Sequence, residues 1–276
     1  MIDSNSIHEV TQRAVAAAMH KLGRDRFRRE DFITTPLEIK VPGLDRAFDG
    51  YRIVHFTDIH FGHWVSHERL EGIVSIINEL RPDLVVNTGD FVSYVFDDLA
   101  QDMISSLRRI KAADGALAVL GNHDHWLEPE RVREALRAGG FQVLDNDVVT
   151  ISRGEANLHI AGVDDVIVCA DRLDQVMEKM PETGPALILV HEPDFADETA
   201  ATGRFFLQLS GHSHGLQIRL PGVRHLLRAR YFKKYPTGRY QINGMVQYTS
   251  NGVGTHAMRL RINCPPEIVV VKLVPG

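Results

Sequence analysis

Short apolar runs alternate with amphipathic segments over the first half of the chain. The runs that have the length and composition of strands are 37–41, 52–56, 84–86 and 116–120. The segments that repeat apolar residues at helical spacing are 68–80, 97–111 and 130–138. This alternation of strands and helices predicts an α/β fold built around a sheet.

The second half of the chain is richer in strands. Further apolar runs predict strands at 141–144, 148–152, 158–163, 186–190, 205–209, 246–249 and 268–274. Among them only 171–180 has a helical pattern. We therefore expect an antiparallel portion to be added to the sheet after its parallel part.

The N-terminal residues 1–31 have a different pattern. Apolar residues recur at helical spacing between Ile7 and Leu22, with Arg13 and Lys21 elsewhere on the helix surface. Such a helix could lie on an anionic lipid surface, or it could pack on its own domain, which is the commoner arrangement. We expect an N-terminal amphipathic helix and connector over residues 1–31, and one larger domain over residues 32–276.

Composition excludes several classes of protein. The chain has 276 residues, of which 44% are hydrophobic, and a net charge of -5, so the overall charge does not point to nucleic acid. No apolar run is long enough to span a membrane, and Glu9 and Arg13 interrupt any signal-peptide core. The two cysteines, Cys169 and Cys264, lie far apart, which is typical of reduced thiols. These features predict a cytoplasmic protein that could contact a membrane peripherally.

Charge is unevenly distributed. Between Glu198 and Glu267 there is no acidic residue, while ten of the 31 lysines and arginines fall in that stretch. A positive lobe of this kind suits an anionic substrate or a membrane surface. The alternative is a solvated rim without a ligand, and the sequence leaves both interpretations open.

Polar clusters follow five of the predicted strands directly. They are Asp58-Ile59-His60, Gly89-Asp90, Gly121-Asn122-His123-Asp124, His191-Glu192-Pro193-Asp194 and Gly211-His212-Ser213-His214. Ligands of open α/β sheets bind outside the carboxyl ends of the strands. We therefore expect these clusters to meet on one rim.

The residue types in these clusters suit divalent cations. Each cluster alone has an ordinary explanation as turn, cap or core residues, but five in succession make that explanation improbable. Carboxylate, carboxamide and imidazole groups without thiolate favour Mn, Fe, Zn, Ni or Co. Two carboxylates, Asp58 and Asp90, would offset only half of the charge of two divalent ions, so the site would still attract a phosphate anion.

In their order and spacing, the five clusters resemble the five motifs of the calcineurin-like metallophosphoesterases. The resemblance covers roughly residues 45–272 and implies a four-layer αββα sandwich with two divalent metal ions between the sheet rims. The implied ligands are Asp58, His60, Asp90 and His214 for the first ion, and Asp90, Asn122, His191 and His212 for the second. The resemblance also implies that His123 contacts the substrate phosphate or the leaving-group oxygen, and that Asp124 orients the His123 imidazole.

The function implied is hydrolysis of phosphate esters, with diesters or aryl phosphates ranked first, by attack of a metal-bridging hydroxide. The segments 48–54 and 211–267 resemble a bacterial branch that includes cell-envelope phosphodiesterases and enzymes cleaving UDP-2,3-diacylglucosamine, so a lipid-linked pyrophosphate is the alternative substrate. Leu216 departs from the glycine usual at its position, which would remove backbone freedom beside the site.

A non-catalytic scaffold that binds a partner or a phosphate-bearing lipid is the alternative of another class. It is disfavoured because all seven ligands are present. Nucleic acid is an unlikely partner, since only Tyr231, Phe232 and Tyr235 accompany the basic stretch as aromatic residues.

Overall fold

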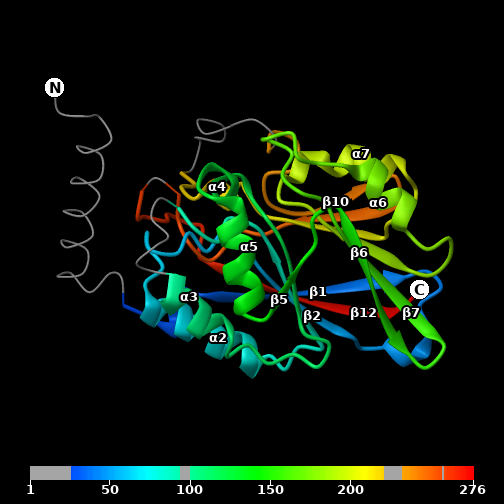
Figure 1. Ribbon diagram of the computed structural model, residues 1–276, viewed down its shortest axis with the longest axis horizontal. Coiled ribbons are helices and arrows are strands. Elements are labelled where there is room, and N and C mark those ends of the chain that lie inside the picture. Colours follow the sequence, from blue (N-terminus) through cyan, green and yellow to red (C-terminus); the bar gives the residue numbers. More distant parts are fainter. Residues whose placement is uncertain (1–25, 94–99, 221–231, 257) are drawn as a thin grey trace.

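The computed structural model describes residues 26–93, 100–220, 232–256 and 258–276. In this part of the chain, two six-stranded sheets pack face to face, and helices cover the outer face of each (Figure 1). The layers are therefore helix, sheet, sheet and helix. This confirms the predicted α/β sandwich.

The first sheet is built mainly from the first half of the chain. Its strands are β1 (Ile33–Val41), β2 (Arg52–Phe56), β3 (Leu84–Thr88), β4 (Ala116–Val119), β5 (Phe141–Val143) and β12 (Glu267–Pro275). Their order is β1-β12-β2-β3-β4-β5. Strands β2 to β5 are parallel, while β12 runs parallel to β1 and antiparallel to β2.

The second sheet comes from the second half of the chain. Its strands are β6 (Asp147–Arg153), β7 (Ala156–Gly162), β8 (Ala186–Leu189), β9 (Leu207–Ser210), β10 (Gly238–Ile242) and β11 (Met245–Thr249). Their order is β10-β11-β9-β8-β7-β6. The four central strands are parallel, and antiparallel hairpin partners β10 and β6 close the two edges.

Six α-helices lie in the described ranges. They are α2 (His67–Glu79), α3 (Ala100–Leu107), α4 (Asn122–Trp126), α5 (Pro129–Ala138), α6 (Leu173–Lys179) and α7 (Ala196–Ala201). Helices α2, α3 and α5 cover the first sheet, and α6 and α7 cover the second (Figure 1). None of these helices is both long and apolar enough to cross a bilayer.

Three hydrophobic clusters fill the three spaces between the layers. Alternate residues of one strand point to opposite sides of a sheet. In β3, Leu84 and Val86 pack between the two sheets, while Val85 packs under the helices. Both faces of the central strands are thus buried, which explains why these strands read as continuous apolar runs.

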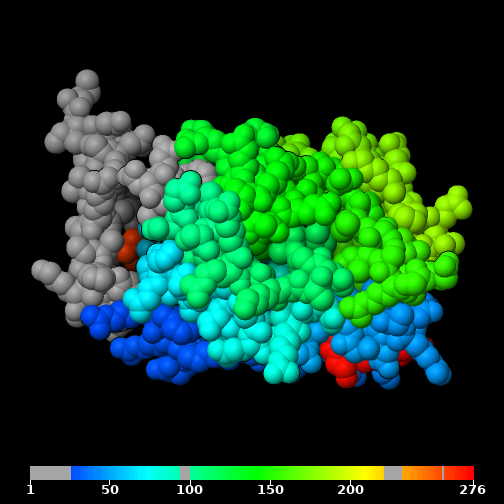
Figure 2. Space-filling model, turned by 60° about the horizontal axis from the view of Figure 1, so that its bottom comes forward, coloured from blue at the N-terminus to red at the C-terminus, as the bar shows by residue number. Residues whose placement is uncertain are grey.

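The last strand connects distant parts of the chain. The C-terminal residues lie against the segment that follows β1 (Figure 2), where the amide of Gly276 donates to the carbonyl of Val41. Insertion of β12 between β1 and β2 brings residues 253 and 254, from the segment before β12, next to the end of β2. The amide of Gly254 there donates to the carbonyl of Asp58 at 2.8 Å.

Most predicted elements are present with ends shifted by a few residues. The predictions missed β10, because its sequence alternates without a strong apolar face, and the short helices α4 and α7. The helix predicted at 97–111 is described from Ala100 and ends at Leu107. The helix predicted between Ile7 and Leu22 and residues 221–231 of the basic stretch lie outside the described residues, so their proposed membrane or substrate contacts stay predictions.

Candidate metal centre

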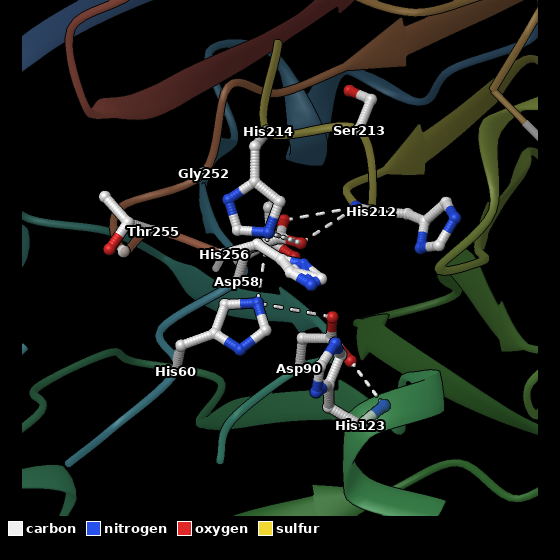
Figure 3. Close-up of polar contacts among 12 residues, drawn as sticks. Asp58, His60, Asp90, His123, His212, Ser213, His214, Gly252, Thr255 and His256 are labelled. Carbon is white, nitrogen blue, oxygen red and sulfur yellow. Dashed lines mark hydrogen bonds and ion pairs between the residues drawn. The ribbon is translucent and has the colours of Figure 1, made fainter. Parts of the chain in front are cut away.

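Strand ends from both sheets meet at one site. Asp58 and His60 follow β2, and Asp90 follows β3. His191 follows β8, and His212 and His214 follow β9. The side chains of Asp58, His60, Asp90 and His214 point toward one another (Figure 3). Of all six residues, only His212 is not fully buried. The rim expected from the sequence is therefore formed by two sheets.

Four side chains form a first cluster of potential ligand atoms. They are Asp58, His60, Asp90 and His214, and one ligand atom from each lies within 4.8 Å of the others. The Nε2 atoms of His60 and His214 are 3.0 Å apart. His214 Nε2 lies 3.4 Å from Asp58 Oδ1, and His60 Nε2 lies 3.4 Å from Asp90 Oδ2. This is the set expected for the first ion.

A second cluster shares Asp90 with the first. It contains Asp90, His191 and His212, again within 4.8 Å of one another. His191 Nε2 lies 3.3 Å from Asp90 Oδ2 and 3.2 Å from His212 Nδ1. Because Asp90 belongs to both clusters, its carboxylate is in the position of a bridge between two cations.

Asn122 carries the remaining expected ligand. Its side chain is 2% exposed, and its Oδ1 atom accepts no hydrogen bond from the described residues. A buried carbonyl oxygen without a donor is costly. A cation is a suitable partner for such an oxygen, so the residue fits the expected site.

Hydrogen bonds to the far nitrogens orient two of the imidazoles. His60 Nδ1 lies 2.8 Å from Ser93 Oγ, and His191 Nδ1 donates to the carbonyl of Thr88 at 2.6 Å. With a proton on Nδ1 of His191, its Nε2 lone pair faces Asp90 and the second cluster. Such outer hydrogen bonds commonly fix the tautomer of metal-binding histidines.

Burial sets the charge of the first cluster. It lowers the pKa of His60 and of His214 well below the ordinary value, so both imidazoles are neutral, as a metal ligand must be. Burial also raises the pKa of Asp58. A nearby cation would offset that penalty because it favours the carboxylate.

Asp90 and His191 stabilise each other's charged forms. Burial disfavours the charged form of each, but their mutual attraction outweighs it, so the pKa of Asp90 is lowered and that of His191 is raised. Cations held by the two clusters would take the place of the protonated His191 imidazole as the partner of the Asp90 carboxylate.

Backbone strain is concentrated at the ligands. Five of the seven have positive φ, with values of 53° at Asp58, 47° at His60, 57° at Asp90, 66° at His212 and 49° at His214. Only a few per cent of non-glycine residues have positive φ, and such strain persists where surrounding contacts impose it, typically at functional sites.

Asp124 accepts hydrogen bonds from three backbone amides. Its Oδ1 accepts from Phe91 at 2.9 Å and Val92 at 3.1 Å, and its Oδ2 accepts from Gly121 at 3.0 Å. The carboxylate therefore ties the loop after β3 to the start of α4. These contacts hold the backbone just before His123. The expected role of Asp124 in orienting the His123 imidazole stays a prediction.

His123 lies at the mouth of the site. Its backbone amide donates to Asp90 Oδ1 at 2.9 Å. Its ring centroid is 4.8 Å from that of His60, at nearly a right angle. The imidazole therefore borders the first cluster, where a substrate oxygen could reach it.

Comparison with known proteins identifies the family of this arrangement. Residues 51–216, more than half of the chain, match the calcineurin-like phosphoesterase family. The chain belongs to that family. It is therefore a metal-dependent hydrolase of phosphoric esters, and the resemblance seen in the five polar clusters is confirmed.

Three relatives illustrate the range of metallophosphoesterases similar to this chain. The uncharacterized metallophosphoesterase YkuE of Bacillus subtilis is 35% identical over 246 residues, which cover 87% of this chain and 85% of that protein. Phosphodiesterase YaeI of Escherichia coli is 27% identical, covering 81% of this chain and 82% of its own length. A transmembrane protein with a metallophosphoesterase domain from Danio rerio is 28% identical, and the match covers 86% of this chain but 56% of that protein.

A sixth strand end belongs to this metallophosphoesterase site and was missed. After β11 come Asn251, Gly252 and Gly254, in the same kind of polar and glycine-rich segment as the other five clusters. Gly252 has a φ of 71°, and a Cβ atom there would lie 2.8 Å from Asp58 Cβ. The rule used for the other strand ends would have found this segment.

Arg261 was missed for a different reason. Its guanidinium donates to the carbonyls of Asn251 at 2.7 Å, Gly252 at 3.2 Å and His214 at 3.4 Å, and also to Gly254. It thereby fastens the loop after β11 to the loop that carries His214. A single arginine in a basic stretch carries no local signal for this role.

Leu216 has the backbone strain that its sequence position suggested. Its φ is 67°, in the left-handed region that glycine adopts freely. A leucine there costs about 1–2 kcal/mol. The cost falls on the turn that directly follows His214.

Proposed function

We propose that the chain is a binuclear metal-dependent phosphoesterase that prefers phosphodiesters or aryl phosphates. The observation that carries the proposal is the pair of ligand clusters with Asp90 in common. Asn122, whose buried Oδ1 accepts no hydrogen bond from the described residues, would complete the second cluster.

The residues fit two divalent ions drawn from Mn, Fe, Zn, Ni and Co. Asp58, His60, Asp90 and His214 would hold the first, and Asp90, Asn122, His191 and His212 the second. When bound, such ions lower the pKa of a coordinated water and offset the negative charge of the phosphate. The protein itself contributes only two carboxylates to the ligand set, so it leaves the site positive enough to attract an anionic ester.

We assign His123 to the side of the substrate from which the leaving group departs. Its imidazole borders the first cluster, and the Asp90 carboxylate and the Asp124 carboxylate hold its backbone in place. In this position it can give a proton to the departing oxygen while water attacks phosphorus from the opposite side. No side chain need form a covalent bond to the phosphoryl group.

A substrate panel tests the proposal. Protein reconstituted with each metal should hydrolyse aryl and alkyl phosphodiesters, and removal of the metal by a chelator should abolish the activity. Monoesters and a UDP-linked lipid serve as competing substrates in the panel. If the metal-loaded protein hydrolyses none of these esters, a binding scaffold becomes the better explanation.

His123→Ala separates chemistry from metal binding. This variant should keep its metal content and lose about 10²–10⁴-fold in kcat. The loss should shrink for a nitrophenyl leaving group, which needs no proton. An equal loss for leaving groups of every acidity would refute proton donation by His123.

A further inference from the structure

Two exposed aromatic side chains lie directly beside His123. Trp126, at the end of α4, is 59% exposed, and its indole centroid is 4.7 Å from the His123 imidazole centroid. Most large hydrophobic side chains in the described ranges are buried. An exposed indole in contact with the proposed proton donor is a surface available to a substrate.

His256 borders the same imidazole. Its ring centroid is 4.9 Å from that of His123, at 82°, and 6.0 Å from that of His60. Figure 3 shows its ring beside those of His60 and His214, in front of Asp58. In the sequence, His256 repeats no ligand spacing, so its position beside His123 is visible only in the structure.

The loop that carries His256 is held in place. The buried side chain of Gln217 accepts from the His256 amide at 2.8 Å and donates to the carbonyl of Met258 at 2.8 Å. Met258 is 50% exposed. These two bonds link the backbone at His256 and Met258 to the turn after His214, so the loop backbone on which His256 lies is anchored beside the site.

We propose that Trp126 and His256 form a subsite for the leaving group that accepts an aromatic alcohol. Offset or edge-to-face contact with the indole and imidazole suits a planar ring. This proposal rests on the proposed function, because His123 defines the side on which the leaving group departs. It specifies the substrate class as aryl esters.

A kinetic comparison tests the subsite. The substrates are two methyl phosphodiesters whose leaving groups have similar acidity, 1-naphthol and hexafluoroisopropanol. Trp126→Ala should lower the ratio of kcat/KM for the naphthyl ester to that for the fluoroalkyl ester by about 3–10-fold, and Trp126→Phe should restore most of it. His256→Ala should lower the ratio in the same direction.

His67→Ala serves as the matched control. His67 is a partly exposed histidine on α2 that contacts Glu71 and Asp102. This variant should keep the wild-type ratio. An unchanged ratio in Trp126→Ala and in His256→Ala would overturn the subsite.

Fluorescence provides a test that needs no turnover. The chain has two tryptophans, and Trp64 is only 9% exposed, with the Arg69 guanidinium 3.9 Å from its ring centroid. Titration of the metal-loaded protein with 4-nitrobenzylphosphonate should quench emission saturably. The quenching should persist in Trp64→Phe and disappear in Trp126→Phe.

Failure of the subsite can be distinguished from failure of the proposed function. If no ester is hydrolysed, the proposed function fails, and quenching still decides whether the subsite binds an aryl group. If esters are hydrolysed but saturable quenching persists in Trp126→Phe, the subsite fails and the proposed function stands.

Discussion

The ligand-bearing loops of the two sheets are held by side chains of opposite charge. In the first sheet, the Asp124 and Asp90 carboxylates accept hydrogen bonds from backbone amides of the loops after β3 and β4. In the second sheet, Arg261 and Arg219 donate to backbone carbonyls of the loops after β9 and β11. Acidic groups thus fix the loops of the first sheet, one wall of the site, whereas guanidinium groups fix the loops of the second sheet, the other wall, together with carboxylate contacts from Asp58 and Glu267.

This difference explains much of the uneven charge along the sequence. Arg219 and Arg261 belong to the acid-free stretch, and both are used inside the structure. Arg204 likewise donates to the carbonyls of Pro181 and Gly184. Neither a substrate-binding lobe nor a solvated rim describes these three residues. The acidic wall favours cations, while the arginines favour an anionic ester beside them.

Asp90 and His191 give the largest expected contrast between the two walls. Asp90 lies in both clusters, whereas His191 lies in one. Asp90→Ala should therefore lose both ions and on the order of 10³-fold or more in activity. His191→Ala should retain about one ion. Metal analysis of the purified variants measures this, and two retained ions in Asp90→Ala would show that the bridge is misassigned.

Arg261 and Asp124 test how the walls are held. Arg261→Met should cost about 3 kcal/mol of unfolding free energy, because several carbonyls lose a charged donor. Asp124→Asn should cost about 1–3 kcal/mol, because an amide oxygen replaces a charged acceptor and one oxygen is lost. Urea unfolding at a fixed metal concentration measures both.

Hydrogen exchange should separate the two variants. Arg261→Met should expose amides in the loops after β9 and β11, and Asp124→Asn should expose amides in residues 90–92 and 121–123. Loosening of the same loops in both variants would contradict the division into two walls.

Two buried histidines, one in each sheet, allow the acid sensitivity of the two sheets to be compared. The expected effect on stability is the smallest of those predicted. Burial lowers the pKa of His55 in β2 from 6.5 to about 3. Burial also lowers the pKa of His159 in β7, but its bond to the Thr183 carbonyl opposes the change. The first sheet should therefore be the more sensitive to acid.

The direction in which stability changes with pH follows from proton binding at His55. Between pH 6.5 and about 3, the unfolded chain binds a proton at His55 that the folded protein does not, so stability falls as the pH falls. The slope from this residue is at most about 1.4 kcal/mol per pH unit. His55→Gln should reduce the acid slope of unfolding free energy more than His159→Gln does, with chelator present throughout. Equal slopes in the two variants would remove the distinction between the sheets.

Many of the elements and the ligand types could be predicted because they depend on local pattern. Strands buried on both faces must be apolar along their length, and ligands must carry oxygen or nitrogen donors, so each polar cluster stands out at a strand end. The clusters at Asp58 and His214 are visible separately in this way. Their order along the chain was enough to indicate the family.

Other features of the site were decided by tertiary structure alone. His60 and His214 lie 154 positions apart in sequence, yet their Nε2 atoms are 3.0 Å apart because the two sheets pack face to face. Pairing of β9 with β11 brings Arg261 against the His214 loop, and packing between distant segments also brings His256 beside His123. Local periodicity specifies which face of an element is buried, but not which distant element covers it. The sequence pattern by itself thus determined most of the elements and the ligand chemistry, and the resemblance to the family implied the layers, whereas long-range packing determined which side chains surround the ligands.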